Sequence, residues 1–179
     1  MKIGKTEIRI VKADITKLTN VEAIVNSASK TLQSGGGVNG AIHKAAGDGL
    51  LQECRRLKGC STGEAKITRA YRLPCVYVIH TVAPVWHGGS WNEAEQLTSC
   101  YRNCLRLAKE KGIRSIAFPS LSTGVNAYPA DQAAEIAIRE VMRVIKEDPD
   151  AFDLIQWALF DQRTKNTYDA ALQIVSLLS

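Results

Sequence analysis

The chain has 179 residues, of which 45% are hydrophobic and 23% are charged. This length can bury one sizeable core but is short for two domains, so we expect residues 1–179 to form a single domain. The formal net charge of +5 and the pI near 9.0 favour an anionic partner. No segment approaches the ~18 consecutive apolar residues of a membrane span, and the N-terminus lacks an apolar signal region, so we expect a cytoplasmic protein without a membrane partner.

Short apolar runs and helical periodicity alternate along the chain. We expect strands at 7–13, 23–25, 65–71, 76–80, 113–118 and 154–160, and helices at 40–58, 92–111, 130–147 and 167–178. This alternation predicts an α/β fold in which a mostly parallel sheet has helices on both faces. Ligands of such sheets bind at the carboxyl ends of the strands.

Cysteine and histidine give no sign of a disulfide framework or a metal site. The five cysteines are odd in number and never form a C-x-x-C pair. Cys100 and Cys104 stand one helical turn apart, as buried core thiols often do. His43 and His80 lie on mainly apolar elements, and we expect both to be hydrogen-bonded structural groups. His87 is expected in a loop.

The first informative loop is SGGGVNG, residues 34–40, which separates an apolar strand from a helical segment. Glycine allows positive φ and lets backbone N–H groups face an anion without interference from Cβ. The N-terminus of the following helix adds partial positive charge. The loop therefore favours phosphate binding, although a tight turn with a helix cap explains it equally well when it is considered alone.

A second loop, residues 120–129, has the same character and follows the predicted strand ending at Phe118. Ser122, Thr123 and the amides around Gly124 could hold a phosphate. Two such loops on neighbouring strand ends would together hold a diphosphate.

Familiar nucleotide motifs do not explain the first loop. It is not a Walker A loop, because no Gly-Lys-Ser/Thr follows the glycines. Gly35, Gly37 and Gly40 match G-x-G-x-x-G, but they stand well beyond the end of the preceding strand, and the downstream region is helical rather than a strand with an acidic end. We therefore expect no nicotinamide and no other cofactor.

The basic residues are scattered and are not interleaved with aromatic residues. A small molecule that carries phosphate therefore fits the charge at least as well as a nucleic acid, which stays possible but is not favoured. The residues concerned include Arg55, Arg56, Lys58, Arg102, Arg106, Lys109, Lys111 and Arg114.

Six segments together resemble the macro domain family, in the family's order and over nearly the whole chain. They are KADIT (12–16), AIVNSAS (23–29), SGGGVNGAIHKAAG (34–47), TGEAKITRAYRLPCVYVIHTVAPVW (62–86), IAFPSLSTGVNAYP (116–129) and ALFD (158–161). The resemblance is closest to the bacterial and mitochondrial type that removes ADP-ribose from proteins and deacetylates O-acetyl-ADP-ribose. It implies one macro domain over 1–179, with a mixed sheet in a three-layer α/β/α sandwich, and ADP-ribose or an ADP-ribosylated protein as partner. We expect a monomer, although the sequence leaves the oligomeric state open.

The resemblance also implies the residues that bind ADP-ribose. Asp14 would accept a hydrogen bond from the adenine amine beside the Ile15 backbone, although a helix N-cap is an equally good role for Asp14. Phe160 would pack against adenine, or it could be a core aromatic residue at a strand end. Asn26 would reach the far ribose, or it could bridge strand ends. The diphosphate would be lined by Gly35, Gly36, Gly37 and Val38 and by Ser122, Thr123, Gly124, Val125 and Asn126.

Three positions depart from the family pattern. Ser29 replaces the second Asn of N-A-A-N, Asn39 replaces the Asp of G-G-G-V-D-G, and Asn126 replaces an aromatic residue over the far ribose. Positions 29 and 39 are the candidate catalytic positions. A neutral amide can orient water but cannot take its proton, and loss of a general base typically removes ~10²- to 10⁴-fold of rate.

These departures make binding of ADP-ribose with slow or altered hydrolysis the expected function. A fully active hydrolase or deacetylase stays open, because some macro domains without this Asp are thought to use the substrate's own phosphate to activate water. Binding of RNA or of other nucleotides is the third alternative.

Overall fold

The computed structural model describes residues 1–179 and contains one seven-stranded sheet. Its strands are β1 (Lys2–Ile3), β2 (Thr6–Lys12), β3 (Ala23–Ser27), β4 (Ala65–Arg69), β5 (Tyr77–Thr81), β6 (Ser115–Phe118) and β7 (Leu154–Leu159). They lie in the order β1-β2-β7-β6-β3-β5-β4. The five central strands are parallel, and the two edge strands β1 and β4 pair antiparallel to their neighbours. The predicted mixed, mostly parallel sheet is confirmed.

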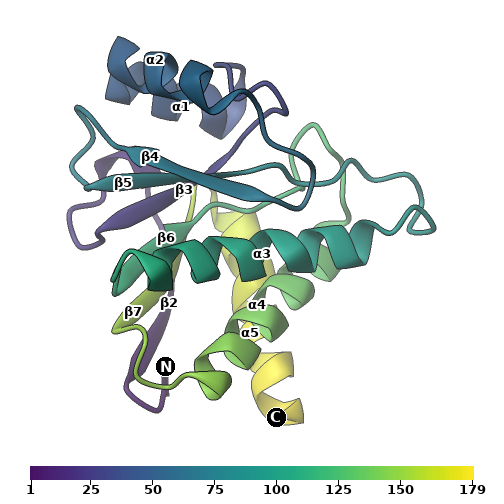
Figure 1. Ribbon diagram of the computed structural model, residues 1–179. Coiled ribbons are helices and arrows are strands. Elements are labelled where there is room, and N and C mark those ends of the chain that lie inside the picture. Colours follow the sequence, from purple (N-terminus) through teal and green to yellow (C-terminus); the bar gives the residue numbers. More distant parts are fainter.

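Helices cover both faces of this sheet (Figure 1). Helices α1 (Gly37–Ala46) and α2 (Asp48–Leu57) cover one face, and α3 (Glu93–Glu110), α4 (Ala130–Glu147) and α5 (Gln162–Leu178) cover the other. A short 3₁₀ helix, η1 (Ile15–Lys17), follows β2. No helix combines the length and the apolar character needed to cross a membrane. The predicted three-layer sandwich is confirmed.

The apolar runs form central strands because both faces of the sheet are buried. In β3, Ala23 and Val25 pack into the core beneath α3, α4 and α5, while Ile24 points to the opposite face, toward α1 and α2. Side chains alternate between the two faces of a strand, so a continuous apolar run satisfies both cores at once.

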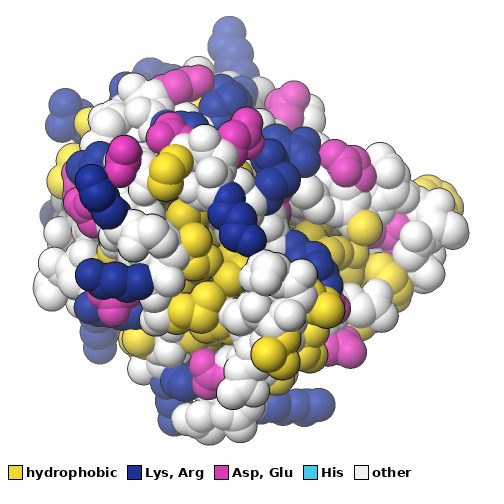
Figure 2. Space-filling view, turned by 90° about the horizontal axis from the view of Figure 1, so that it is seen from below, with side chains coloured by type: hydrophobic (Ala, Val, Ile, Leu, Met, Phe, Trp, Pro, Cys, Tyr) yellow, Lys and Arg dark blue, Asp and Glu magenta, His cyan; other side chains and the backbone are white.

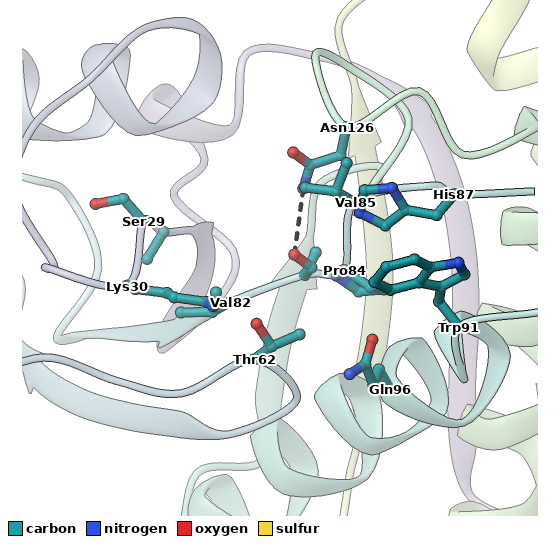
Figure 3. A pocket seen from close by; sticks show the side chains of 12 residues that line it. Ser29, Lys30, Thr62, Val82, Pro84, Val85, His87, Trp91, Gln96 and Asn126 are labelled. Carbon is teal, nitrogen blue, oxygen red and sulfur yellow. Dashed lines mark hydrogen bonds between the residues drawn. The ribbon is translucent and has the colours of Figure 1, made fainter.

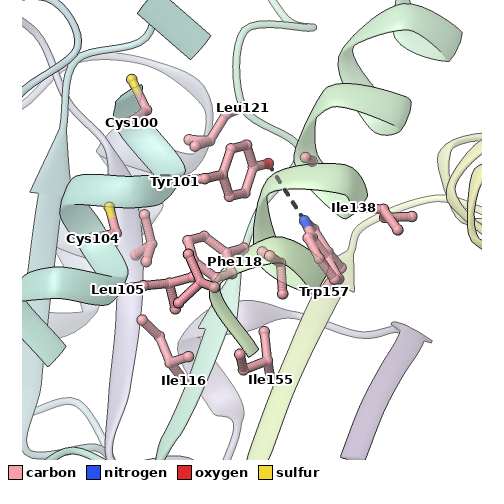
Figure 4. Packing of buried hydrophobic residues seen from close by; sticks show 14 of the residues in the cluster. Cys100, Tyr101, Cys104, Leu105, Ile116, Phe118, Leu121, Ile138, Ile155 and Trp157 are labelled. Carbon is pink, nitrogen blue, oxygen red and sulfur yellow. Dashed lines mark hydrogen bonds between the residues drawn. The ribbon is translucent and has the colours of Figure 1, made fainter. Parts of the chain in front are cut away.

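The larger core contains a group of aromatic side chains that fixes β6 and β7 against α3 (Figure 4). The ring centroid of Phe118 lies 4.8 Å from that of Tyr101 and 5.7 Å from that of Trp157. Trp157 Nε1 donates to the Tyr101 hydroxyl at 3.4 Å, so the indole is not left without a partner. Cys100 and Cys104 are buried beside these rings, and all five thiols are free. This packing holds the carboxyl ends of β6 and β7, from which two loops of the site emerge.

Two predicted helices differ from the observed ones. The segment 40–58 forms two helices because Gly47, with φ of 86°, interrupts the helical conformation between α1 and α2. Helix α5 begins at Gln162 rather than at 167, because Asp161 Oδ1 accepts a hydrogen bond from the Thr164 N–H at 2.7 Å and caps the helix. The two-residue strand β1 was not predicted, since a pair of residues carries no periodicity.

Candidate functional site

A cavity of about 640 Å³ opens at the carboxyl ends of β2, β6 and β7. Because these strands are parallel neighbours, the segments that follow them meet at one edge of the sheet. The N-terminal turn of α1 forms a further wall. The walls are made by Ala13, Asp14 and Ile15 after β2; Gly37, Val38 and Ala41 of α1; Pro119, Ser120, Thr123 and Gly124 after β6; and Ala158, Leu159, Phe160, Asp161 and Thr164 at the end of β7 and the start of α5.

Asp14, Ile15 and Phe160 form one end of the cavity. Asp14 is the N-cap of η1: its Oδ1 accepts from the Thr16 N–H at 3.0 Å and from the Thr16 hydroxyl at 2.7 Å. The hydrogen bond from the Thr16 side chain lowers the pKa of Asp14, so the carboxylate is ionised at neutral pH and its second oxygen is free to accept. Phe160 is 83% exposed at the rim, so the alternative of a core aromatic residue is wrong.

The glycine loop forms the wall beside α1. Gly36 is the N-cap of α1, and Gly37, its first residue, has φ of 56°, a conformation that other residues rarely adopt. Gly37 and Val38 line the cavity, whereas Gly35 and Gly36 do not. A Cβ on Gly40 would collide with the Gly35 carbonyl oxygen, so the fourth glycine is required by packing within the loop. The first N–H groups of α1 have no partner within the helix.

The second loop faces the glycine loop across the cavity. Thr123 and Gly124 line the cavity, together with Ser120, whose hydroxyl lies 2.6 Å from that of Thr123. Ser122 points elsewhere, because its hydroxyl is buried and donates to the Pro84 carbonyl at 2.5 Å. Val125 is fully exposed.

Asn26 and Asn39 are buried and joined in one hydrogen-bonded chain. Asn26 Nδ2 donates to Asn39 Oδ1 at 2.9 Å and to His80 Nδ1 at 3.1 Å. Asn39 Nδ2 donates to the Gln33 carbonyl at 3.0 Å. Asn26 Oδ1 is buried and has no partner in the protein. In this hydrogen-bond network, Asn26 Oδ1 is therefore the one unused acceptor, and Asn39 has both its amide oxygen and its amide nitrogen engaged.

The two buried histidines differ. His80 is hydrogen-bonded at both nitrogens, to Asn26 and, through Nε2, to the Thr68 hydroxyl at 3.0 Å, as expected for a structural group. Desolvation, with a smaller contribution from His43, lowers the pKa of His80 to about 3, so the ring is neutral. His43 has no partner at either nitrogen, so the expectation that it is hydrogen-bonded is wrong. Burial also lowers the pKa of His43.

A second cavity, of about 410 Å³, is lined in part by Ser29 and Asn126 (Figure 3). Ser29 Oγ is 3.2 Å from Thr31 Oγ1 and donates weakly to the Gln33 carbonyl at 3.4 Å, the same carbonyl that Asn39 binds. Asn126 Nδ2 donates to the Ala83 carbonyl at 3.2 Å. The remaining walls are Ala28, Lys30, Thr62, Val82, Ala83, Pro84, Val85, His87, Trp91 and Gln96.

Apart from Ser29 and Asn126, no residue of this second cavity was predicted to belong to a site. His87 was expected only as a loop residue, and Trp91 carried no motif. The segment between β5 and α3 that holds both residues projects from the body of the molecule (Figure 1). It is organised by Glu93, whose buried carboxylate accepts from the N–H groups of His87, Gly89 and Trp91 at 2.8, 2.9 and 2.6 Å. A glutamate in the first turn of a helix is common, so its sequence position did not reveal this role.

Basic side chains are spread over the surface, and nine of the 23 form ion pairs. On the face drawn in Figure 2, Lys and Arg side chains are interspersed with Asp and Glu side chains around a central hydrophobic region. Arg106 and Arg114 form ion pairs with Glu110 and Asp153 at 3.0 and 2.9 Å. No lysine or arginine lines the first cavity. An anion there would be held by backbone amides and the α1 N-terminus.

Comparison with known proteins identifies the family. A family model described as Macro domain matches residues 25–137. Macro domain-containing protein CT2219 of Chlorobaculum tepidum is 56% identical over 165 residues, which are 92% of this chain and 95% of that protein. ADP-ribose glycohydrolase MACROD2 of Xenopus laevis is 48% identical over 155 residues, which are 86% of this chain and 37% of that protein.

Comparison with solved structures points to the same family. The Oceanobacillus iheyensis macrodomain with ADP is 39% identical and superposes with a TM-score of 0.95, covering 100% of this chain and 96% of that one. The Trypanosoma brucei macrodomain in complex with ADP-ribose is 41% identical with a TM-score of 0.87, covering 92% of this chain and 68% of that one. Sequence and structure together show that this chain belongs to the macro domain family.

Proposed function

We propose that residues 1–179 form one macro domain that binds ADP-ribose, free or attached to a protein, in the cavity at the ends of β2, β6 and β7. The observation that carries this proposal is the arrangement of that cavity. A carboxylate and an exposed aromatic ring stand at one end, and two amide-rich loops face each other further along. Its volume of about 640 Å³ suits a ligand of this size. Related macrodomains with ADP and with ADP-ribose support the choice of ligand.

Adenine would lie between Asp14 and Phe160. The free oxygen of Asp14 can accept an N–H from the adenine amine, and the exposed ring of Phe160 offers a flat face for stacking. The N-cap role of Asp14 uses only Oδ1, so both roles are compatible.

The diphosphate would lie between the two loops. Gly37 and Val38 contribute N–H groups of the first turn of α1. The N–H groups of 123–125 donate to no backbone carbonyl, so they are available on the other side. Gly35 and Gly36 would then shape the first loop, and Ser122 and Val125 the second, because none of the four lines the cavity.

Hydrolysis of the ADP-ribosyl ester would be slow. Asn39 carries no charge, donates to Gln33 and accepts from Asn26, so it has no group left that could take a proton from water. Ser29 is also neutral. The loss of a negative charge about 8 Å from the diphosphate would meanwhile relieve about 0.5–2 kcal/mol of repulsion per charge pair. Binding should therefore survive this departure better than turnover.

A fully active hydrolase of mono-ADP-ribosyl proteins, or an O-acetyl-ADP-ribose deacetylase, is the second candidate. The glycohydrolase relative supports it, and the unused Asn26 Oδ1 could accept a hydrogen bond from a ribose hydroxyl. In this case the substrate's own phosphate would activate water. Binding of RNA is not favoured, because the basic side chains form no continuous surface on the face of Figure 2.

Isothermal titration with ADP-ribose tests the binding proposal. We expect saturable binding with a Kd in the micromolar range or tighter, and no detectable binding would overturn both candidates. Release of ADP-ribose from a glutamate-modified protein, by the natural chain and by Asn39→Asp, separates them. A gain of ~10²- to 10⁴-fold in the variant supports an impaired centre, while equal and fast rates favour the phosphate-assisted route.

A further inference from the structure

The buried hydrogen-bond network around Asn26 ends on a backbone carbonyl at each side. At one end the Gln33 carbonyl accepts from Asn39 Nδ2 at 3.0 Å. At the other end the Arg69 carbonyl accepts from the Thr68 hydroxyl at 2.9 Å. A backbone carbonyl can accept a hydrogen bond but cannot donate one. Each group between the two ends must therefore take the donor or acceptor role that these carbonyls leave to it.

The Arg69 end determines which nitrogen of His80 carries the proton. The single hydrogen of the Thr68 hydroxyl goes to the Arg69 carbonyl, so this hydroxyl can only accept from His80 Nε2, which lies 3.0 Å away. The ring is neutral, because desolvation lowers the pKa of His80 to about 3, and its one proton is on Nε2. His80 Nδ1 is then an acceptor, and the donor 3.1 Å from it is Asn26 Nδ2.

The Gln33 end places a second acceptor next to Asn26. Because Asn39 Nδ2 donates to the Gln33 carbonyl, Asn39 Oδ1 is the atom that faces Asn26 Nδ2, at 2.9 Å. The two hydrogens of Asn26 Nδ2 therefore go to Asn39 and His80. Rotation of the Asn26 amide by 180° would set its oxygen against these two acceptors, so the amide has one allowed orientation, with Oδ1 left over.

The buried side chains of the molecule have unmade hydrogen bonds only in this region. Three buried side-chain nitrogen or oxygen atoms lack a partner: Asn26 Oδ1 and the two ring nitrogens of His43, whose ring centroid lies 6.4 Å from that of His80. Folded proteins leave few such atoms, so a group of them indicates where a ligand or a water completes the bonding. Asn26 is in contact with the proposed site, since Asn39 belongs to the first turn of α1, which lines the first cavity.

We infer that Thr68 and His80 are positioning residues of the proposed ADP-ribose site, which act through Asn26. They hold the Asn26 amide so that it offers an acceptor, and not a donor, to a hydroxyl of the far ribose or to a water bound to that hydroxyl. Thr68 lies on the edge strand β4 and His80 on β5, and neither lines either cavity. This inference rests on the proposed function and names the residues that set the hydrogen-bonding preference of that site.

The substitution Thr68→Val tests the inference, because it keeps the branched shape of the side chain but removes the acceptor for His80 Nε2. The Cys54 thiol, 3.8 Å from Nε2, can then donate to this nitrogen and favour a proton on Nδ1. That proton would oppose the Asn26 Nδ2 hydrogens, so the amide would lose its fixed orientation. ¹⁵N NMR of the His80 ring identifies the protonated nitrogen, and titrations with ADP-ribose and with ADP, which lacks the far ribose, measure the consequence for binding.

In the natural chain we expect the His80 proton on Nε2 alone. In Thr68→Val we expect ring signals with the proton on Nδ1, and an affinity for ADP-ribose that is at least about fivefold lower, while the affinity for ADP is unchanged. Thr68→Ser keeps the hydroxyl and should keep the natural proton position and both affinities. Thr6→Val makes the same change at a buried residue of β2, whose hydroxyl donates to the Phe152 carbonyl at 2.7 Å, and should leave the ratio of the two affinities unaltered.

The outcomes separate this inference from the proposed function. A His80 proton on Nδ1 in the natural chain would overturn the inference, and this measurement needs no variant. The inference is also wrong if Thr68→Val weakens ADP and ADP-ribose equally or changes neither affinity. In all these cases the proposed function stands if the natural chain binds ADP-ribose. If the natural chain binds neither ligand, both are wrong.

Discussion

The amide of Asn39 is bound at both ends, and the two hydrogen bonds have opposite sense. Its oxygen accepts from Asn26 and its nitrogen donates to the Gln33 carbonyl. An aspartate could keep the first bond but would turn a carboxylate oxygen toward the Gln33 oxygen. The loop from 33 to 39 therefore uses both the oxygen and the nitrogen of the amide at position 39, and a carboxylate could not make the same two hydrogen bonds.

The substitution Asn39→Asp should accordingly destabilise the fold by about 1–3 kcal/mol, because a buried donor is lost and two acceptors face each other. Urea unfolding at neutral pH measures the change. Lys146→Asp, at an exposed position of α4, serves as a surface control. Unchanged stability of Asn39→Asp would mean that the Gln33 carbonyl turns away freely, and that the amide is not structurally required.

Phe160 offers a second test at the scale of one residue. Because its side chain is 83% exposed, Phe160→Ala should leave the free energy of unfolding nearly unchanged. Loss of a base–aromatic stack worth about 1–3 kcal/mol should weaken ADP-ribose binding at least about fivefold. Titration with ADP-ribose measures the affinity of this variant, and urea unfolding measures its stability. A strongly destabilised variant, or one with unaltered affinity, would remove Phe160 from the adenine site.

The directions in which the Phe160 and Ser122 side chains point could not be predicted from the sequence. Phe160 extends the apolar run of β7 and fitted a core position as well as a rim position. Ser122 carries a hydroxyl of the kind that can donate to a phosphate, but with its positive φ of 71° this hydroxyl points toward Pro84 instead. Neither direction is encoded in local residue types, because each depends on which segment lies alongside.

Among the elements, the turn before α3 depends on a single carboxylate. Desolvation opposes ionisation of Glu93, but hydrogen bonds from the backbone of His87, Gly89, Glu93 and Trp91 prevail and lower its pKa to about 2. A carboxyl group whose pKa is depressed in the folded state stabilises that state above its ordinary pKa of 4.5. That contribution is lost as pH falls from about 4.5 toward 2.

We predict that Glu93→Gln destabilises the chain at pH 7, and that the difference from the natural chain shrinks as pH falls through this window. The Gln side chain can accept through one atom only, so at least one turn amide loses its partner. Unfolding at several pH values measures the difference, and hydrogen exchange at 87, 89 and 91 should accelerate. Glu95→Gln, on the exposed side of α3, is the control. A difference that does not vary with pH would contradict the role of the charge.

Six of the seven strands and most helices were predicted from periodicity, because burial on one or both faces dictates the pattern of apolar residues. Helix α4 was predicted with its observed bounds. The break at Gly47 was not predicted because the amphipathic pattern continues through it. The start of α5 at Gln162 was not predicted because its N-cap, Asp161, lies outside the apolar pattern.

At the scale of the molecule, a chain of net charge +5 has no lysine or arginine in the lining of the cavity proposed to bind an anion. The expected attraction comes from amides and a helix N-terminus, and such dipoles release few counterions when a ligand binds. Some of the scattered basic residues instead form ion pairs: Arg106 with Glu110 within α3, Lys109 with Asp148, and Arg114 with Asp153.

Affinity for ADP-ribose should therefore change by less than about threefold between 50 and 200 mM salt, whereas nucleic acid held by several phosphate contacts loses ~10³–10⁵ over the same range. Titration at the two salt concentrations, with a single-stranded RNA as competitor, measures both. A steep salt dependence together with displacement by RNA would favour the nucleic-acid alternative.

The most direct test of the central claim is a titration of the ¹⁵N-labelled chain with ADP-ribose, followed by amide chemical shifts. We predict saturable shifts that are largest at Gly37, Val38 and Gly124, where the diphosphate should lie, with smaller changes at Ile15 and Phe160. The absence of saturable shifts, or shifts confined to residues outside this cavity, would contradict it.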